Sequence, residues 1–190
     1  MDDSVLAAIA RWPNVPAVFG WLQLTARGEW RIRGERIGNA AIRDFIGRNY
    51  AHDALGRWYF QNGPQRVYAE LQVLPWIVRV DAGGTLSLHT GQSPSACLGG
   101  ALLDDGRFVL ETELGAALID DRDAAIFVRA VTDFAGMPLN DRGLERWLAG
   151  KDEAFVAPAR LRVAGTARRI ERLRVANLEA RYGFVRVPTG

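Results

Sequence analysis

The sequence predicts an α+β protein made of two similar lobes of antiparallel strands, each lobe carrying one main helix. Short apolar stretches, separated by glycine, proline, asparagine and aspartate, predict strands joined by tight turns. Two stretches with apolar residues at helical spacing follow polar capping residues and predict the main helices. Both halves show the same order of hairpin, capped helix and further strands, which predicts an internal repeat.

In the first half, capping residues and turn residues indicate where most helices and strands begin and end. The expected elements are a short amphipathic helix at 3–12, a hairpin with strands at 18–25 and 30–33, a helix from 39 to 50, and strand pairs at 57–61 with 66–73 and 76–80 with 86–89. Asn39 is suited to cap the helix because its side chain can accept from a free backbone N–H. Asn62-Gly63-Pro64 is a strong turn signal between two strands.

The second half begins after a stretch rich in glycine and serine at 91–100. The expected elements are strands at 101–103, 108–111 and 116–119, a helix from Asp120 or Asp121 to about Phe134, a short helix at 143–148, and strands near 159–163, 168–175 and 178–187. Asp105-Gly106 is the sharpest hairpin signal in the chain.

The repeat is visible residue by residue in the two hairpins. Four residues of the first hairpin lie 78 positions before similar residues of the second, namely Leu24, Gly28, Trp30 and Ile32 before Leu102, Gly106, Phe108 and Leu110. We therefore expect an N-terminal lobe at 1–90 and a C-terminal lobe at 91–190 within one compact body. Trp30 and Phe108 should occupy equivalent buried sites.

Composition bounds the class of protein. A chain of 190 residues can bury enough surface to fold without a metal or a disulfide. Cys97 is the only cysteine, so no intrachain disulfide is possible. Acidic residues stand where a signal peptide would carry positive charge, and no apolar run is long enough to span a membrane. We expect a cytoplasmic protein.

The net charge of +2 is unevenly distributed. Eight arginines fall within 160–190, several of them alternating with apolar residues at strand spacing. A solvated strand face is the first interpretation and a surface for an acidic protein partner the second. Nucleic acid is the least favoured, because few aromatic residues lie near for bases to stack on.

For each candidate catalytic or metal-binding motif, a structural explanation fits the sequence better. His52, His89 and Cys97 do not form a zinc set of familiar spacing. Cys97 with His89 could form a nucleophilic pair, but a small buried cysteine and a histidine at a strand end explain them better. The aspartates at 104–105 and 120–123 suit a turn and a helix start. We expect no metal, no cofactor and no catalytic residue.

The segment 57–68 is the best candidate for a binding site. It combines aromatic and polar side chains around a proline turn, as a small-molecule or peptide site requires. The predicted ligand contacts are Trp58, Phe60, Asn62, Gln65 and Arg66. The competing interpretation is a structural hairpin whose aromatic residues pack on both faces of a sheet.

Two stretches carry a resemblance to known families. Residues 12–24 and 57–68 resemble an uncharacterised family of proteobacterial proteins of about this length. The layout from Gly28 to Val80, with its Gly-x-Trp hairpin, capped helix, proline turn and Pro75-Trp76, resembles a second uncharacterised bacterial family. The second resemblance implies a duplicated α+β fold and a role in signalling. This chain has Gln65-Arg66 where that family has a Glu-Lys pair, and neither resemblance implies a reaction.

The sequence thus favours a non-enzymatic binding or regulatory protein. It would recognise a small polar or anionic ligand or an acidic protein partner, with no membrane involved, and the second resemblance adds a role in signalling. The alternative class is a hydrolase or transferase with an unrecognised active site. The oligomeric state is left open.

Overall fold

The computed structural model describes residues 1–81, 85–133, 135–149, 160–163 and 166–190. The chain forms two compact units, the first from residues 1–77, 88–92 and 176–190, and the second from residues 78–87 and 93–175. This division differs from the expected boundary, because residues 176–190 return to the first unit and residues 78–87 belong to the second.

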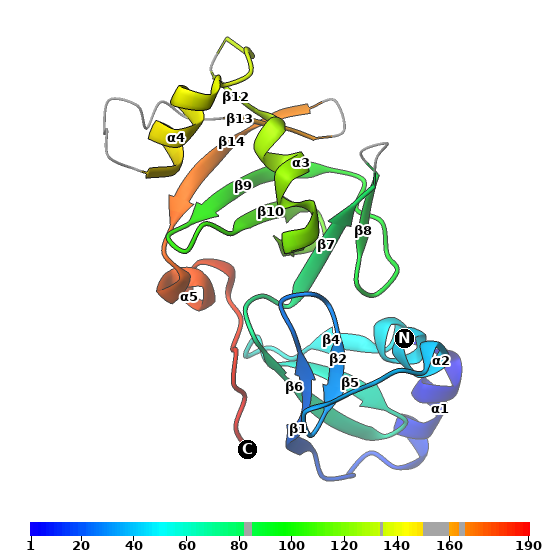
Figure 1. Ribbon diagram of the computed structural model, residues 1–190. Coiled ribbons are helices and arrows are strands. Elements are labelled where there is room, and N and C mark those ends of the chain that lie inside the picture. The colour runs from blue at the N-terminus through cyan, green and yellow to red at the C-terminus, as the bar shows by residue number, and fades with distance from the viewer. Residues whose placement is uncertain (82–84, 134, 150–159, 164–165) are drawn as a thin grey trace. The chain divides into compact units, whose positions relative to one another are not determined.

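The first unit contains a six-stranded sheet with the strand order β3-β2-β1-β6-β5-β4. Its elements are α1 (Asp3–Arg11), β1 (Val18–Leu24), β2 (Trp30–Ile32), β3 (Glu35–Arg36), α2 (Ala40–Arg48), β4 (Tyr50–His52), β5 (Trp58–Asn62), β6 (Gln65–Leu71), η3 (Val175–Asn177, which begins at the last residue of the second unit) and α5 (Leu178–Tyr182). Helices α1 and α2 lie beside each other (Figure 1), and Arg48 of α2 pairs with Asp2 before α1. Asn39 caps α2 by accepting from the Ile42 N–H, as expected.

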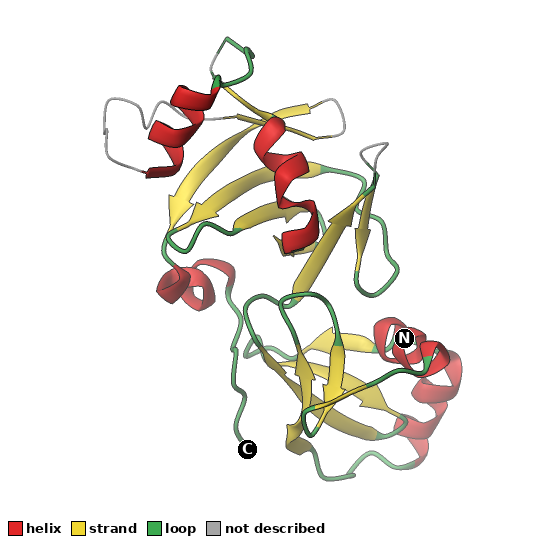
Figure 2. Ribbon diagram, viewed as in Figure 1, coloured by secondary structure: helices red, strands yellow, loops and turns green. Residues whose placement is uncertain are grey.

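The second unit is built on an eight-stranded sheet with the order β12-β13-β14-β9-β10-β11-β7-β8. Its elements are β7 (Trp76–Val80) and β8 (Leu86–Leu88), which also carry residues of the first unit, then β9 (Cys97–Leu103), β10 (Phe108–Thr112), β11 (Gly115–Ile119), η1 (Asp121–Asp123), α3 (Ala124–Arg129), β12 (Val131–Thr132), α4 (Asp141–Ala149), β13 (Arg160–Val163) and β14 (Thr166–Leu173). Strands predominate over helices in each unit (Figure 2).

The two units repeat one topology, which confirms the α+β fold with two similar lobes. Strands β1, β2 and β3 correspond to β9, β10 and β11, helix α2 corresponds to α3, and strands β4, β5 and β6 correspond to β12, β13 and β14. In both sheets the first strand of the set pairs with the last, β1 with β6 and β9 with β14.

The hairpin register agrees with the repeat predicted from the sequence. Leu24 lies opposite Trp30, and Leu102 lies opposite Phe108. Trp30 is 1% exposed and Phe108 is 4% exposed, so both fill the cores of their units. Gly28 and Gly106 take the left-handed conformation at the same place in the two turns, with φ of 73° and 85°.

The strand pair at the centre of each repeated six-strand set is parallel, in contrast to the expected antiparallel arrangement. The chain leaves each hairpin, crosses by way of a helix, and reaches the last strand of the set through two further strands. That strand lies beside the first one and runs in the same direction. Parallel neighbours need such a long connection, whereas hairpins join antiparallel ones.

Three elements differ from their expected extents. Helix α3 ends at Arg129, because Val131 and Thr132 pair with β13 as strand β12. The expected strand at 178–187 begins instead with helix α5, whose residues are good helix formers and which ends at Gly183 in the left-handed conformation. Helix α4, expected at 143–148, lies between β12 and β13, where the first unit has only a short link.

Some expectations fall on residues 82–84, 134, 150–159 and 164–165, outside the described part of the chain. They concern the third hairpin turn, the end of the second main helix and the start of the strand near 159. Within the described residues, no helix has the length and apolar character needed to cross a bilayer.

Candidate functional site

The sheet of the first unit has two distinct faces. Strand pairing places Leu24, Leu71 and Phe60 on one face, which we call the inner face, and Gln23, Glu70 and Tyr59 on the other, which we call the outer face. Helix α2 covers the inner face, where Phe45 packs edge-to-face on Phe60 at 5.5 Å between ring centres.

A tight turn after β8 places His89 against this inner face. The turn spans Leu88 to Gln92, and the Leu88 N–H donates to the Gln92 carbonyl at 2.7 Å. The first hairpin approaches it so closely that a Cβ on Gly28 would lie 2.7 Å from the His89 Cβ. Helix α2 also approaches the next residue closely, since a Cβ on Gly47 would lie 3.0 Å from the Thr90 carbonyl oxygen. Two glycines therefore allow His89 and Thr90 to fit between the hairpin and α2.

Aromatic rings surround His89. Its ring centre lies 5.3 Å from that of Trp30, 5.9 Å from that of Tyr50 and 5.9 Å from that of Trp76. The Trp58 ring extends this group, because its centre lies 4.8 Å from that of Tyr50 and 5.1 Å from that of Trp76. We call these five residues, together with Thr90, the His89 cluster.

The His89 cluster contains four buried polar atoms with no hydrogen-bond partner within the protein. They are Trp30 Nε1, Trp76 Nε1, His89 Nε2 and Thr90 Oγ1. Buried polar side-chain atoms are nearly always satisfied, and leaving one unpaired costs about 1–3 kcal/mol. Four such atoms on neighbouring residues are an unusual concentration of unsatisfied polar groups, and they make this cluster the candidate site.

The charge state of His89 determines whether its unpartnered Nε2 atom donates or accepts a hydrogen bond. The Ile77 N–H donates to Nδ1 at 3.3 Å, so in the neutral ring Nε2 carries the proton. Burial lowers the pKa of His89 to about 3, and the ring is neutral at pH 7. Together with the two indole N–H groups, the cluster presents three neutral donors and one hydroxyl.

The five predicted ligand contacts do not lie on one side of the sheet. Trp58 and Phe60 belong to the inner face, and Trp58 is part of the His89 cluster. Arg66 lies on the outer face, with its guanidinium carbon 4.8 Å from the centre of the Tyr59 ring. A single ligand resting against one face cannot contact all of them.

The two remaining predicted contacts lie at the end of the hairpin between β5 and β6. Asn62 and Gln65 are opposite each other, and Gln65 donates from Nε2 to the Pro16 carbonyl at 3.0 Å. Gln65 therefore ties the 13–17 segment to the sheet. A role of either residue in binding stays a prediction.

The second unit uses its reactive and acidic groups for structure. Burial raises the pKa of the Cys97 thiol, which donates to the Gly99 carbonyl. Asp120 caps η1 by accepting from the Arg122 N–H and pairs with the Arg122 side chain. Asp123 accepts from Arg79 at 2.6 and 3.1 Å, and these bonds lower its pKa. Among the described residues, no three potential ligands gather to hold a metal.

The arginine-rich C-terminal stretch is split between the units. Strands β13 and β14 adjoin, as the alternating pattern suggested, and both belong to the second unit. Arg172 is exposed and lies 5.7 Å from the ring centre of the buried Trp147. Arg186 belongs to the first unit and pairs with Glu179. The described part of this stretch is therefore divided between strands of the second unit and the C-terminal segment of the first.

Sequence reasoning missed most of the His89 cluster. Trp30 was expected in the core, and Trp76 and His89 as strand residues, without a common site. The signal was present in part, because Trp30 and Tyr50 occupy inward positions of their elements. The turn that brings His89 over the hairpin leaves no spacing pattern in the sequence.

The fold defines a duplicated, two-unit α+β protein, and the His89 cluster is the candidate site in its first unit. The chain belongs to the family DUF2944, described as "Protein of unknown function (DUF2946)", whose model matches residues 1–189. This match confirms the resemblance to an uncharacterised family.

Solved structures of other bacterial proteins also resemble this chain. No curated protein matches the chain. A DUF1285 family protein from Silicibacter pomeroyi DSS-3 is 16% identical, with a TM-score of 0.54 over 89% of this chain and 95% of that one. A DUF1285 family protein from Shewanella baltica OS155 is 15% identical, with a TM-score of 0.43 over 56% of this chain and 89% of that one. The first likeness supports the fold alone.

Proposed function

We propose that this protein is a non-enzymatic binding protein that recognises a small polar or anionic ligand through the His89 cluster. The observation that carries the proposal is the group of four unpartnered polar atoms among packed aromatic rings. Such a combination of apolar walls with a few donors is typical of ligand sites.

The donors favour one class of ligand. Two indole N–H groups and the neutral Nε2–H of His89 can only donate, so their partner must supply acceptors, as a carboxylate, a carbonyl or a ring nitrogen does. Neutral donors can satisfy an anion, and the flat rings of Trp58 and Trp76 favour a planar group. Binding of this kind would suit a regulatory protein that responds to a metabolite.

Native mass spectrometry of the protein as purified tests the proposal. We expect a bound small molecule in the wild type, and its loss in Trp76→Phe, which removes one donor and keeps an aromatic ring. The matched control is Trp147→Phe, because Trp147 is a buried tryptophan of the second unit. The control should retain the molecule. A wild type with no bound compound, or a compound equally retained by Trp76→Phe, would contradict the proposal.

A further inference from the structure

The unpartnered polar atoms of the His89 cluster are all buried, so a ligand can reach them only after part of the cluster moves. The four aromatic residues of the cluster each begin a strand, namely Trp30 in β2, Tyr50 in β4, Trp58 in β5 and Trp76 in β7. Moving any of them would break hydrogen bonds of a sheet. His89 and Thr90 lie in the 88–92 turn instead. This turn is therefore the part of the cluster that can move most easily.

The 88–92 turn keeps its shape through hydrogen bonds of its own. The Leu88 N–H donates to the Gln92 carbonyl at 2.7 Å, and the Gly91 N–H donates to the Leu88 carbonyl at 2.9 Å. Beyond Leu88, in the described part of the chain, the turn bonds to strand β7 at Ile77. The His89 N–H donates to the Ile77 carbonyl at 2.9 Å, and the Ile77 N–H donates to His89 Nδ1 at 3.3 Å. Segments held by so few bonds can open locally while the rest of the protein stays folded.

The outer end of the turn faces solvent. Gly91 and Gln92 are exposed, whereas His89 and Thr90 are half-buried. Gly91 takes a φ of 86°, and no atom lies within 4 Å of a Cβ at this position. Glycine changes its backbone conformation at little steric cost. The turn therefore lies between the buried aromatic rings and solvent, with a glycine at its outer end.

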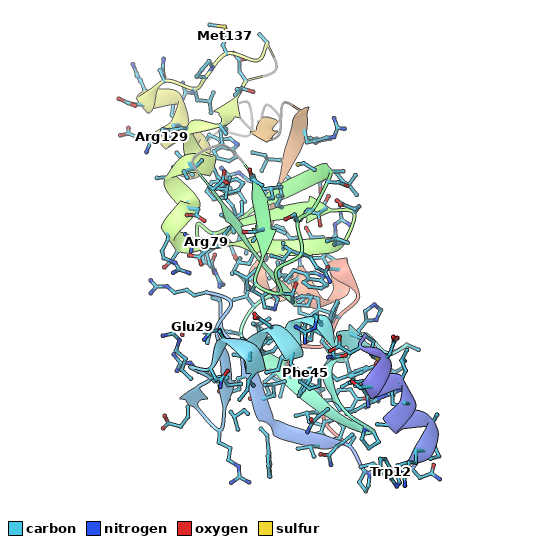
Figure 3. The ribbon with its side chains drawn as sticks, turned by 90° about the vertical axis from the view of Figure 1, so that its right-hand side faces the viewer. Trp12, Glu29, Phe45, Arg79, Arg129 and Met137 are labelled. Carbon is cyan, nitrogen blue, oxygen red and sulfur yellow. The ribbon has the colours of Figure 1, made fainter. Side chains whose placement is uncertain are left out.

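Helix α2 is shaped to receive the turn at Gly47. A Cβ at Gly47 would lie 3.0, 3.1 and 3.3 Å from the carbonyl oxygen, the Cα and the Cβ of Thr90. Figure 3 marks this helix by Phe45, two residues earlier in the chain. Alanine is a far better helix former than glycine. The close approach of Thr90, rather than the helix itself, thus accounts for glycine at this position.

We propose that the 88–92 turn is a lid that opens to admit the ligand to the His89 cluster and closes over it. In the closed state the lid supplies hydrogen bonds from His89 Nε2 and Thr90 Oγ1, and the strands supply the indole N–H groups of Trp30 and Trp76. This inference rests on the ligand site proposed above. Opening of the lid requires no ligand, so it can be measured on the ligand-free protein.

Hydrogen exchange in D2O, followed by nuclear magnetic resonance, tests the lid through the Nε1–H signals of Trp30 and Trp76. The protein is first freed of any ligand by denaturation and refolding. In the wild type we expect both indole signals to exchange through local opening, faster than the stability measured by urea unfolding would allow. Exchange of both signals only at the rate that global unfolding allows would overturn the proposal.

Gly47→Ala should loosen the lid, because the added Cβ presses on Thr90. We expect the two indole signals to exchange about tenfold faster, and the Nε1–H signal of Trp147 in the second unit to be unaffected. The matched control is Gly38→Ala, since no atom lies within 4 Å of a Cβ on Gly38. This control should exchange as the wild type does. Unchanged exchange of the two signals in Gly47→Ala would contradict a lid.

A disulfide between the turn and α2 gives the sharper test. Gly47→Cys combined with Thr90→Cys places two Cβ atoms 3.3 Å apart, close to the roughly 3.5–4.5 Å found in disulfides. The native Cys97 is buried in the second unit. In the oxidised variant the two indole signals should exchange at least about tenfold more slowly, and reduction should restore their rates.

The outcomes separate the lid from the ligand site. Equal exchange in the oxidised and reduced forms would overturn the lid, even if a bound molecule is found in the protein as purified. Slower exchange in the oxidised form, in a protein that carries no bound molecule as purified, would support the lid and contradict the ligand site.

Discussion

The two units share a strand order but differ in how they treat their polar groups. In the second unit, Asp123 pairs with Arg79, and the Glu113 carboxylate accepts from the Ser95 and Ala96 N–H groups, which lowers the pKa of Glu113 to about 2. All of the buried polar side-chain atoms without a partner, among the residues that the structure describes, belong to the first unit.

This difference distinguishes the residues that the shared fold needs from those on which the proposed function rests. Topology and hairpin register are common to both units, so they reflect what the fold needs. The unpartnered polar atoms of the His89 cluster belong to the first unit, and the described residues of the second unit contain no such atom. We infer that the first unit carries the proposed ligand site and that the second repeats the architecture without it.

The largest expected effect tests the equivalence of the two hairpin cores. Trp30→Ala and Phe108→Ala should each reduce the free energy of unfolding by ~3–5 kcal/mol, because each removes a buried aromatic side chain. Urea unfolding followed by circular dichroism measures both. A loss below about 1 kcal/mol for Phe108→Ala would show that the two positions are not equivalent.

Replacing the turn glycines should destabilise the two hairpins by different amounts. Gly28→Ala and Gly106→Ala both place a side chain at positive φ, which costs about 1–2 kcal/mol. No atom lies within 4 Å of a Cβ on Gly106, whereas a Cβ on Gly28 would press on the His89 Cβ at 2.7 Å. Gly28→Ala should therefore be the more destabilising in urea unfolding, by at least about 1 kcal/mol. Equal losses would contradict the close approach to His89.

The two hairpins also show how much a sequence can reveal. Trp30 and Phe108 were predictable because a residue-level match fixes their register, and turn chemistry fixes the hairpins. The parallel central strands and helix α5 were not, because both depend on where the chain returns. Trp76 lies in β7 and His89 in the turn after β8, without any common motif, so their meeting depends on tertiary packing. The division of Trp58 and Arg66 between faces follows from strand alternation and could have been predicted from the register of β5 and β6.

A smaller effect concerns pH and His89. Its pKa of about 3 in the folded protein lies below the ordinary value of about 6.5 in the unfolded chain. The unfolded chain therefore binds the proton first, and stability should fall as pH drops from about 6.5 towards 3. The slope from this residue is at most about 1.4 kcal/mol per pH unit.

Urea unfolding between pH 5 and 6.5 isolates this contribution, since most carboxylates stay ionised there. His89→Gln should flatten the dependence on pH. His52→Gln, which changes an exposed ring, should keep it. A dependence unchanged by His89→Gln would mean that His89 is not buried in its neutral form.

The most direct test of the central claim follows the indole N–H signals of the tryptophans by nuclear magnetic resonance. The protein as purified is compared with the same protein after denaturation, dialysis and refolding, which removes any bound small molecule. If a ligand accepts from the His89 cluster, the Nε1–H signals of Trp30 and Trp76 will shift on refolding, and that of Trp147 in the second unit will not. Superimposable spectra before and after refolding would contradict the claim that a ligand satisfies these donors.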